Sequence, residues 1–295
     1  MQIDIKYMKR ALQLARLGEG LVSPNPMVGA VIVAADGKII SEGYHHCYGG
    51  PHAEVCAVNS VKNSDRHLLS DSTIYVTLEP CSHYGKTPPC AKLIIDTGIP
   101  RVVVGSADPF PEVSGRGIRM LRDAGVEVME NVLRDECDAL NVRFLTAHRL
   151  RRPWIQLKWA QSSDGFMAGT DKDGKPFPVQ FSTSVSSVWM HRRRSMVDAI
   201  MVGKNTLEID HPRLDCRHWP GRPPRRVQPR HDLEQQMKEL YKEGVTSLMV
   251  EGGPTLLQSF IDLGLYDDIR IETSEKKLGE GLPSPLIKSK DKRLN

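Results

Sequence analysis

The chain has 295 residues, with 40 lysines and arginines against 36 aspartates and glutamates, and a formal net charge of +4. This length is enough for about two domains with separate hydrophobic cores. No apolar run approaches the roughly 18 residues that a membrane-spanning helix needs, and the first residues contain no apolar stretch typical of a secretory signal. Composition therefore predicts a globular cytoplasmic protein without a membrane partner, and the mild charge gives no reason to expect nucleic acid binding.

The chain opens with apolar residues at helical spacing over residues 4–17, which predicts an amphipathic helix. The Ser-Pro-Asn-Pro sequence at 23–26 then forms an extended turn, because each proline disfavours a helical conformation of its predecessor. Asn25 lies on this turn, and its residue type alone fits a simple turn residue. Two strands follow around an Asp36-Gly37 turn, a hairpin signal. His45 comes just past the second strand, where a histidine is more often a surface residue than a functional one.

The segments PHAEVCAV at 51–58 and TLEPCSHYGKTPPC at 77–90 offer an imidazole, two thiolates and a carboxylate: His52, Cys81, Cys90 and Glu54. Catalytic zinc takes three protein ligands and leaves a fourth position open for water. A His-x-Glu followed by Pro-Cys, a spacer and a second Cys is typical of zinc-dependent nucleobase deaminases, in which the Glu carries protons and does not bind the metal. The short form of that pattern has two residues between the cysteines, whereas this chain has eight.

A purely structural zinc site is the alternative, and it requires a fourth protein ligand. His83 is the nearest candidate in the sequence. We expect a helix from His52 to Val61 and a second helix that begins at Cys90. A helix N-terminus lowers the pKa of a thiol and so favours metal binding. The remaining cysteines are expected to be free thiols.

Strands and helices then alternate, with a strand at 72–80 and a helix at 134–149 among them, which predicts a layered α/β domain. The pattern breaks at Arg151-Arg152-Pro153 and restarts with a strand at 154–162. No GxGxxG sequence follows a strand, so a dinucleotide-binding Rossmann domain is not expected. The Gly252-Gly253-Pro254 turn lies between an apolar strand and a helix, where bare backbone amides can bind phosphate. Such turns are also common for steric reasons.

Together, SPNPMVGAVIV at 23–33, PHAE and TLEPCSHYGKTPPC resemble the deaminase half of the bifunctional riboflavin-biosynthesis deaminase/reductases, over roughly residues 5–148. DAIMVGKNTLEIDHPRLDCR at 198–217 and SLMVEGGPTLLQSFI at 247–261 resemble the reductase half. The resemblance implies two α/β domains. A cytidine-deaminase-like α/β/α layer domain would span 1–149, and a dihydrofolate-reductase-like α/β domain would span 150–295. It also implies a homo-oligomer.

The implied function is hydrolytic deamination of a diaminopyrimidinone that carries a phosphoribosylamino group, followed by NADPH-dependent reduction of its ribosyl group to a ribityl chain. The resemblance implies Zn²⁺ at His52, Cys81 and Cys90, with Glu54 as the catalytic proton carrier. Arg194 also suits a ribose phosphate because of its forked guanidinium, although a solvated surface charge is the plain alternative. Carried over by position, the remaining assignments are NADPH contacts at Ala160, Thr206, Asp210, Gly253, Pro254, Thr255, Leu256, Leu257, Gln258 and Ser259, and substrate contacts at Asn25, His45, Arg194, Leu214, Arg217 and Glu251.

Two departures from the family pattern lie in the second half. Residues 178–182 replace a Ser-x-Trp-(Ile/Val)-Thr motif, so that Gln180 stands where a tryptophan would stack. The chain also passes directly from Val227 to Gln228, where the family has several further strands. Either those segments are missing from the protein or the given sequence omits them. If they are missing, we expect the sheet that carries the Gly252-Gly253 turn to lack inner strands and the cofactor site to be loose.

Three other functions follow from these features. A deaminase with a degenerate reductase domain would release ammonia without oxidising NADPH. A nucleoside or tRNA deaminase with an unrelated tail is disfavoured by the eight-residue spacer and the modest charge. A binding protein that uses the deaminase fold as a scaffold is disfavoured by the intact set of ligands, since a scaffold has no need of the unligated Glu54.

Overall fold

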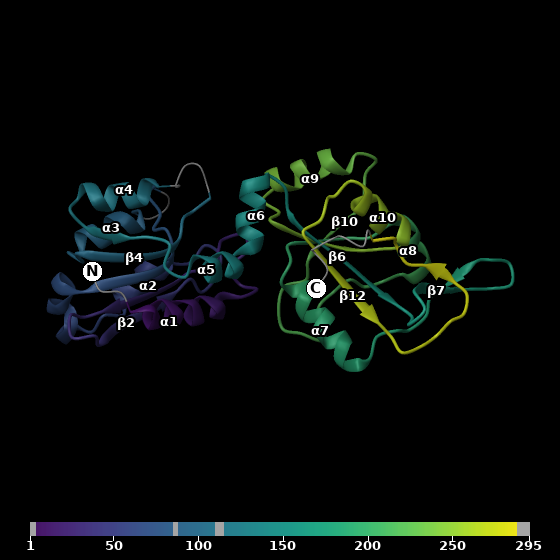
Figure 1. Cartoon of the computed structure of the whole chain (residues 1–295), viewed down its shortest axis with the longest axis horizontal. Coiled ribbons are helices and arrows are strands. Elements are labelled where there is room, and N and C mark those ends of the chain that lie inside the picture. Colours follow the sequence, from purple (N-terminus) through teal and green to yellow (C-terminus); the bar gives the residue numbers. More distant parts are fainter. Residues whose placement is uncertain (1–3, 85–87, 110–114, 288–295) are drawn as a thin grey trace. The chain divides into compact units, whose positions relative to one another are not determined.

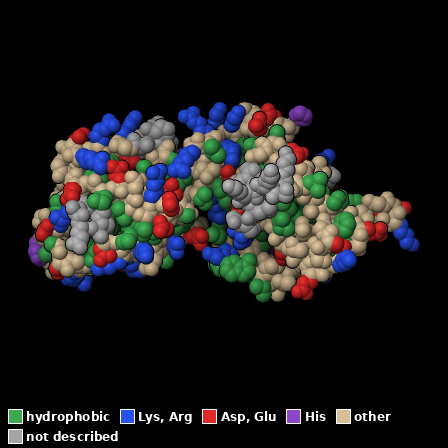
Figure 2. All heavy atoms as spheres, viewed as in Figure 1, with side chains coloured by type: hydrophobic (Ala, Val, Ile, Leu, Met, Phe, Trp, Pro, Cys, Tyr) green, Lys and Arg blue, Asp and Glu red, His purple; other side chains and the backbone are tan. Residues whose placement is uncertain are grey.

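The structure, a computed structural model, describes residues 4–84, 88–109 and 115–287, without the side chains of Asn205, Ile209 and Asp210 (Figure 1). The chain divides into two compact units, Met1–Arg149 and Leu150–Asn295. Among the described residues, no helix is long and apolar enough to cross a membrane. On the face drawn in Figure 2, basic and acidic side chains are interspersed.

The first unit is built on one five-stranded sheet with the strand order β2-β1-β3-β4-β5. The β1 strand pairs antiparallel with β2 and β3, whereas β3, β4 and β5 run parallel. The predicted hairpin around Asp36-Gly37 is therefore present as the β1–β2 pair. The strands are β1 (Gly29–Val33), β2 (Ile39–Tyr44), β3 (Thr73–Leu78), β4 (Arg101–Ser106) and β5 (Glu127–Met129).

Helices cover both faces of this sheet, because successive residues of a strand point to opposite sides. Ala30 and Ile32 pack with α2, α3 and α4, while Val31 and Val33 pack with α1. Figure 1 shows α3 and α4 on one side of the sheet and α1 on the other. This arrangement confirms the predicted α/β/α layers. The helices are α1 (Ile5–Ala15), α2 (Ala53–Asn59), α3 (Cys90–Asp96), α4 (Arg116–Asp123), α5 (Arg134–Leu140) and α6 (Val142–Leu150), with 3₁₀ helices at Arg16–Gly18 and Asn63–Asp71.

The stretch predicted to be helical over 134–149 is helical, but it is not one continuous helix. The structure has two helices, α5 and α6, which are separated at Asn141. The buried Asn141 side chain accepts a hydrogen bond from the Met27 N–H at 2.8 Å and donates one to the Met27 carbonyl at 2.8 Å. These two bonds attach the break between α5 and α6 to the turn that carries Asn25. The helical pattern of the sequence contains no sign of this distant partner.

The second unit contains a parallel five-stranded sheet with the order β10-β9-β11-β6-β12. One face packs against α9 and α10, and residues of α7 and α8 pack on the other. A smaller sheet has the order β13-β7-β8. The strands are β6 (Trp154–Gln161), β7 (Phe166–Thr170), β8 (Pro176–Phe177), β9 (Ala199–Met201), β10 (Arg225–Val227), β11 (Ser247–Glu251), β12 (Asp268–Thr273) and β13 (Leu282–Pro283); the helices are α7 (Ser184–Ser195), α8 (Lys204–Asp210), α9 (Leu233–Lys242) and α10 (Pro254–Asp262).

The expected loss of inner strands is wrong. The β11 strand, which precedes the Gly252-Gly253 turn, pairs with β9 on one side and with β6 on the other. The chain leaves the edge strand β10, runs through residues 228–232 and returns along α9 to β11. Gln236 closes this short connection, since its side chain donates to the Gln228 carbonyl and accepts from the Arg230 N–H.

Replacement of Asn141 by alanine should destabilise the first unit selectively. The substitution leaves the Met27 N–H and carbonyl without their partners, which typically costs about 1–3 kcal/mol. All four tryptophans lie in the second unit, so tryptophan fluorescence follows that unit alone while circular dichroism follows both. We expect the circular dichroism transition in urea to shift and the fluorescence transition to stay. The exposed Asn59→Ala is the control, and equal stability of the two variants would contradict the role of Asn141.

Candidate active sites

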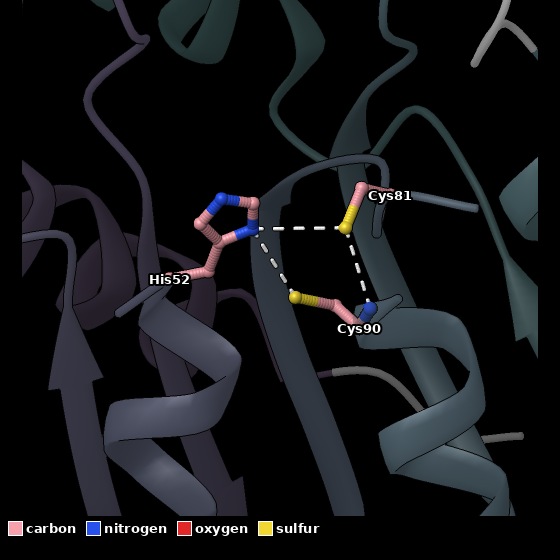
Figure 3. A group of neighbouring side chains, drawn as sticks. All are labelled: His52, Cys81 and Cys90. Carbon is pink, nitrogen blue, oxygen red and sulfur yellow. Dashed lines mark hydrogen bonds between the residues drawn. The ribbon is translucent and has the colours of Figure 1, made fainter. Parts of the chain in front are cut away.

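Three elements bring the predicted metal ligands together in the first unit (Figure 3). His52 caps the N-terminus of α2, Cys81 follows β3, and Cys90 is the first residue of α3. His52 Nδ1 lies 3.6 Å from the Cys81 sulfur and 3.3 Å from the Cys90 sulfur. The three ligand atoms all lie within 4.8 Å of one another, and no further His, Cys, Asp or Glu of the described part of the chain joins the group, His83 included.

The two thiols of this group differ in acidity. A hydrogen bond from Cys90, together with His52, lowers the pKa of the Cys81 thiol to about 4. The Cys90 backbone N–H, 3.3 Å from the Cys81 sulfur, adds to this effect. The pKa of the Cys90 thiol is raised, because the thiol donates a hydrogen bond to Cys81 and is buried. The group therefore already holds one thiolate, and a dication that binds there displaces the second proton.

Glu54 lies in the first turn of α2 and is only 3% exposed. Burial, with the charge of Cys81 as a second cause, raises the pKa of its carboxyl group to about 7. A group with this pKa can both accept and release a proton near neutral pH. Glu54 is close to the three ligands but does not belong to their group. The predicted ligands thus form one group with Glu54 outside it, and the role of Glu54 as the proton carrier stays a prediction.

The hydrogen bonds of His45 fix the orientation of Asn25. His45 Nδ1 lies 2.8 Å from the Pro51 carbonyl, which can only accept, so this nitrogen carries the proton. Burial lowers the pKa of His45, and the ring is neutral. Its Nε2 therefore accepts from the Asn25 side-chain amide at 3.0 Å. The Asn25 oxygen then points away from His45, whose ring lies 5.7 Å from that of His52.

The role predicted for His45 as a substrate contact stays a prediction. The side chain is 3% exposed, and both of its ring nitrogens are used inside the protein. The direct contact of His45 is its hydrogen bond with Asn25, and the Asn25 side chain is only partly buried. The single sequence did not indicate this contact, because the two residues are far apart in the chain.

Glu79, which the sequence analysis did not select, is a buried carboxylate just after β3. One of its oxygens accepts from the backbone N–H groups of Asp108 and Gly115, at 3.3 and 3.0 Å. The other accepts from those of Gly117 and Ile118, at 3.1 and 3.4 Å. The carboxylate thereby connects the end of β4 to the start of α4.

Gly117 also contacts the segment that carries a metal ligand. A Cβ atom at this position would lie 1.9 Å from the carbonyl oxygen of Pro80, the residue before Cys81. Only glycine fits at this distance. Together, Glu79 and Gly117 hold the backbone around Pro80 in place. This fixes the position of the next residue, Cys81.

The second unit contains a cavity of about 690 Å³ at the carboxyl ends of its parallel strands. Open parallel sheets commonly bind ligands at this end. Residues predicted to contact NADPH and residues predicted to contact substrate line the same cavity. The first group comprises Ala160, Thr206, Gly253, Pro254, Thr255, Leu256 and Ser259, and the second comprises Arg194, Leu214 and Glu251.

Four predicted residues are not placed on the cavity wall. Leu257 is fully buried in the core between α10 and the sheet. The Gln258 amide binds Asp262 and the Leu286 backbone. Arg217 forms an ion pair with Asp215 at 2.6 Å. The side chain of Asp210 lies outside the described residues.

Arg194 and Glu251 form a buried, two-pronged ion pair at the cavity wall. The distances from Arg194 Nε and Nη2 to the Glu251 oxygens are 2.9 and 2.7 Å. Desolvation opposes ionisation of Glu251, but Arg194 outweighs it and lowers the pKa of the carboxyl group. The Arg194 fork therefore faces a carboxylate of its own chain, and its role as a substrate contact stays a prediction.

Lys158 is a cavity residue that the sequence analysis missed. It projects from β6, its side chain is 12% exposed, and it lies 3.6 Å from Glu272. The sequence does indicate this position, because apolar and polar residues alternate along the strand. Ile155 and Leu157 face the core, while Gln156 and Lys158 face the other side of the sheet. A lysine inside an otherwise buried strand is unusual unless it is paired.

Two family models match the chain. The cytidine and deoxycytidylate deaminase zinc-binding region matches residues 1–106, and the RibD C-terminal domain matches residues 153–231 and 226–294. The riboflavin biosynthesis protein RibD of Aquifex aeolicus is 37% identical over an alignment that covers 95% of this chain and 89% of that protein. The chain belongs to the RibD family. It thus combines the zinc-binding deaminase domain and the RibD C-terminal domain in the order expected from the sequence.

Other RibD proteins agree with this assignment. The RibD protein of Actinobacillus pleuropneumoniae is 43% identical over 81% of this chain, and the chain spans 62% of that relative. A solved deaminase/reductase from Thermotoga maritima is similar at 35% identity with a TM-score of 0.85, covering 97% of this chain and 91% of that one. RibD of Acinetobacter baumannii gives a TM-score of 0.82 at 28% identity, covering 95% and 89%.

Relatives contain residues that this chain does not have. The alignment with the Aquifex RibD is 327 positions long, which exceeds the 295 residues of the chain. The match to the RibD C-terminal domain is split into two parts that meet at residues 226–231. The split coincides with the short connection between β10 and α9.

Replacement of Glu79 by glutamine should weaken both the fold of the first unit and its hold on metal. The amide loses the charge and turns an N–H donor towards backbone N–H groups, which we expect to cost about 2–4 kcal/mol of unfolding free energy. Zinc retention against a chelator should fall because the backbone around Pro80 is released. Circular dichroism and metal analysis measure the two effects. The exposed Glu136→Gln is the control, and a Glu79→Gln protein that matches it in both respects would contradict the role of Glu79.

Proposed function

We propose that the first unit hydrolytically deaminates a diaminopyrimidinone ribose phosphate, and that the second unit reduces the ribosyl group of the product with NADPH. The observation that carries the first part is the group of one imidazole and two cysteine sulfurs beside a buried, unligated carboxyl group. The solved Thermotoga relative is named as a diaminohydroxyphosphoribosylaminopyrimidine deaminase and 5-amino-6-(5-phosphoribosylamino)uracil reductase, which supports the choice of substrate.

The donor set fits zinc. One nitrogen and two sulfurs match the softness of this ion, and three protein ligands leave a coordination position open. His52 Nδ1 and the sulfurs of Cys81 and Cys90 would hold it. Zinc, when bound, supplies a Lewis acid that makes water nucleophilic at neutral pH.

Glu54 would move the protons of the reaction. Its carboxylate takes a proton from the attacking water and later gives one to the departing amino group. The C–N bond breaks, a C–O bond forms, and ammonia leaves. Burial keeps the pKa of Glu54 near neutrality, so neither transfer is strongly uphill. The Asn25 oxygen, oriented by His45, is an acceptor for an N–H group of the pyrimidine ring.

Glu54→Gln should strongly reduce deamination without loss of zinc, because the amide keeps the shape but cannot accept or release a proton near neutral pH. A general acid-base group contributes about 10²- to 10⁴-fold to the rate, so ammonia release should fall by that factor. Cys81→Ser is the matched variant that should lose the metal as well as the activity. Near-normal ammonia release from Glu54→Gln, or full zinc content in Cys81→Ser, would show that these residues do not have the proposed roles.

The reductase part is supported by the cavity in the second unit. The start of α10 contributes Gly253 to its wall, with backbone amides suited to phosphate. Lys158 and the Arg194–Glu251 pair provide fixed charges on the same wall. The continuous sheet favours a working reductase over a degenerate one, since β11 has a neighbour on each side.

Two assays on the same protein separate the two activities. The unmodified chain should release ammonia from the diaminopyrimidinone and should oxidise NADPH when it is given the deaminated product. Cys81→Ser should lose the first reaction and keep the second, because its substitution lies in the other unit. Ammonia release without NADPH oxidation in the unmodified chain would instead favour the deaminase with a degenerate reductase. The cytoplasmic location and the homo-oligomer stay predictions.

A further inference from the structure

One stretch of the cavity wall, residues 176–181, overlaps residues 178–182, where the chain departs from the family sequence. Within it, every residue except Gln180 lines the cavity. The Gln180 side-chain amide donates to the Ser182 carbonyl at 3.1 Å, and the Gln180 backbone carbonyl accepts from Lys276 Nζ at 2.7 Å. Gln180 is therefore engaged outside the cavity and does not present a surface to a ligand there.

Three aromatic side chains line the cavity, and only one of them has an open ring. Trp159 is 3% exposed and Phe181 is 9% exposed, so both belong to the packed wall. Phe177 is 48% exposed. Large apolar side chains that line a cavity and are exposed to it, without being packed into the core, are typical of ligand-binding surfaces.

Gly169 explains how the Phe177 ring is held. The two residues are opposite each other in the β7–β8 pair. A Cβ atom at Gly169 would lie 2.3 Å from Phe177 Cζ and 2.7 Å from Cε2, so the ring lies directly against bare backbone. Any side chain at position 169 would push the ring aside. The glycine thus supports the ring and leaves the rest of it available to the cavity.

We propose that Phe177 is a stacking surface for a planar heteroaromatic ring bound in the cavity. The inference rests on the proposed reductase function and adds a specificity-determining residue to it. The cavity volume of about 690 Å³ suits a small molecule, and the charged wall at Lys158, Arg194 and Glu251 suits the polar parts of the same ligand. An open apolar ring and charged side chains in the same cavity fit a molecule that has both a flat ring and charged groups.

Three planar rings enter the proposed reaction with its two ligands, the nicotinamide and the adenine of NADPH and the pyrimidine of the deaminated substrate. The experiment distinguishes the two ligands by titrating each one alone into the full chain and following the heat of binding. Phe177→Leu keeps an apolar side chain but removes the ring face. Stacked aromatic pairs gain about 0.5–1.5 kcal/mol beyond their burial, so we expect the dissociation constant of one ligand to rise about 2- to 12-fold. Phe177→Trp should restore the affinity.

Gly169→Ala tests the same contact without altering the ring. The added methyl group meets only the far end of a flexible side chain, so the fold should persist while the ring moves and the same ligand binds more weakly. Trp189→Leu is the control, because Trp189 is a comparably exposed aromatic residue, 52% exposed, on α7 outside the cavity wall. Its affinities for both ligands should equal those of the unmodified chain.

The outcomes separate the inference from the function on which it rests. Weaker NADPH binding in Phe177→Leu and Gly169→Ala assigns the surface to a ring of the cofactor, and weaker pyrimidine binding assigns it to the substrate. Unchanged affinities for both ligands in both variants overturn the stacking role and leave the reductase function standing. If the unmodified chain binds neither ligand, the reductase function fails and the inference falls with it.

Discussion

Close approach of helix and sheet backbones sets the geometry of the first unit. At Gly43 of β2, a Cβ atom would lie 2.3 Å from the Ala57 N–H nitrogen of α2. The absence of a side chain there lets α2 settle against the strand, and α2 carries both His52 at its start and Glu54 in its first turn. A larger residue at position 43 would move the metal ligand and the proton carrier together. The same principle operates at Gly117, where α4 meets the Pro80 carbonyl.

Both units build their sites at strand ends and helix starts. In the first, β3 leads to Cys81 and α3 begins with Cys90; in the second, β11 leads to Glu251 and α10 begins after Gly253. Strand ends are held by the ladder of the sheet, and the first amides of a helix have no partners within it. These positions therefore combine rigidity with free polar groups. Catalytic geometry needs both, since small displacements of reacting groups reduce rates strongly.

Local sequence patterns were sufficient to predict some parts of the fold and of the sites. His52, Glu54, Cys81 and Cys90 were recognisable because residue type and spacing are sufficient for a zinc motif, and the strands were recognisable from their apolar runs. Contacts between distant segments were not predictable in this way. Asn141 interrupts a helix and binds the distant Met27 backbone, and Glu79 accepts hydrogen bonds from the backbone N–H groups of Asp108 and Ile118. The ion pair of Arg194 with Glu251 could not be predicted either, because the two residues are 57 positions apart.

The shortened connection after β10 has a consequence for how the protein behaves at high concentration. Among the described strands, β10 pairs only with β9, so its other side presents an open backbone edge. Open edges invite pairing with a second chain and aggregation. This edge is only three residues long, and its two arginines, Arg225 and Arg226, are both exposed. Arg225 is held by an ion pair with Glu243 at 2.6 Å. Charged side chains on so short an edge disfavour pairing with another chain, at the point in the fold where relatives carry additional sequence.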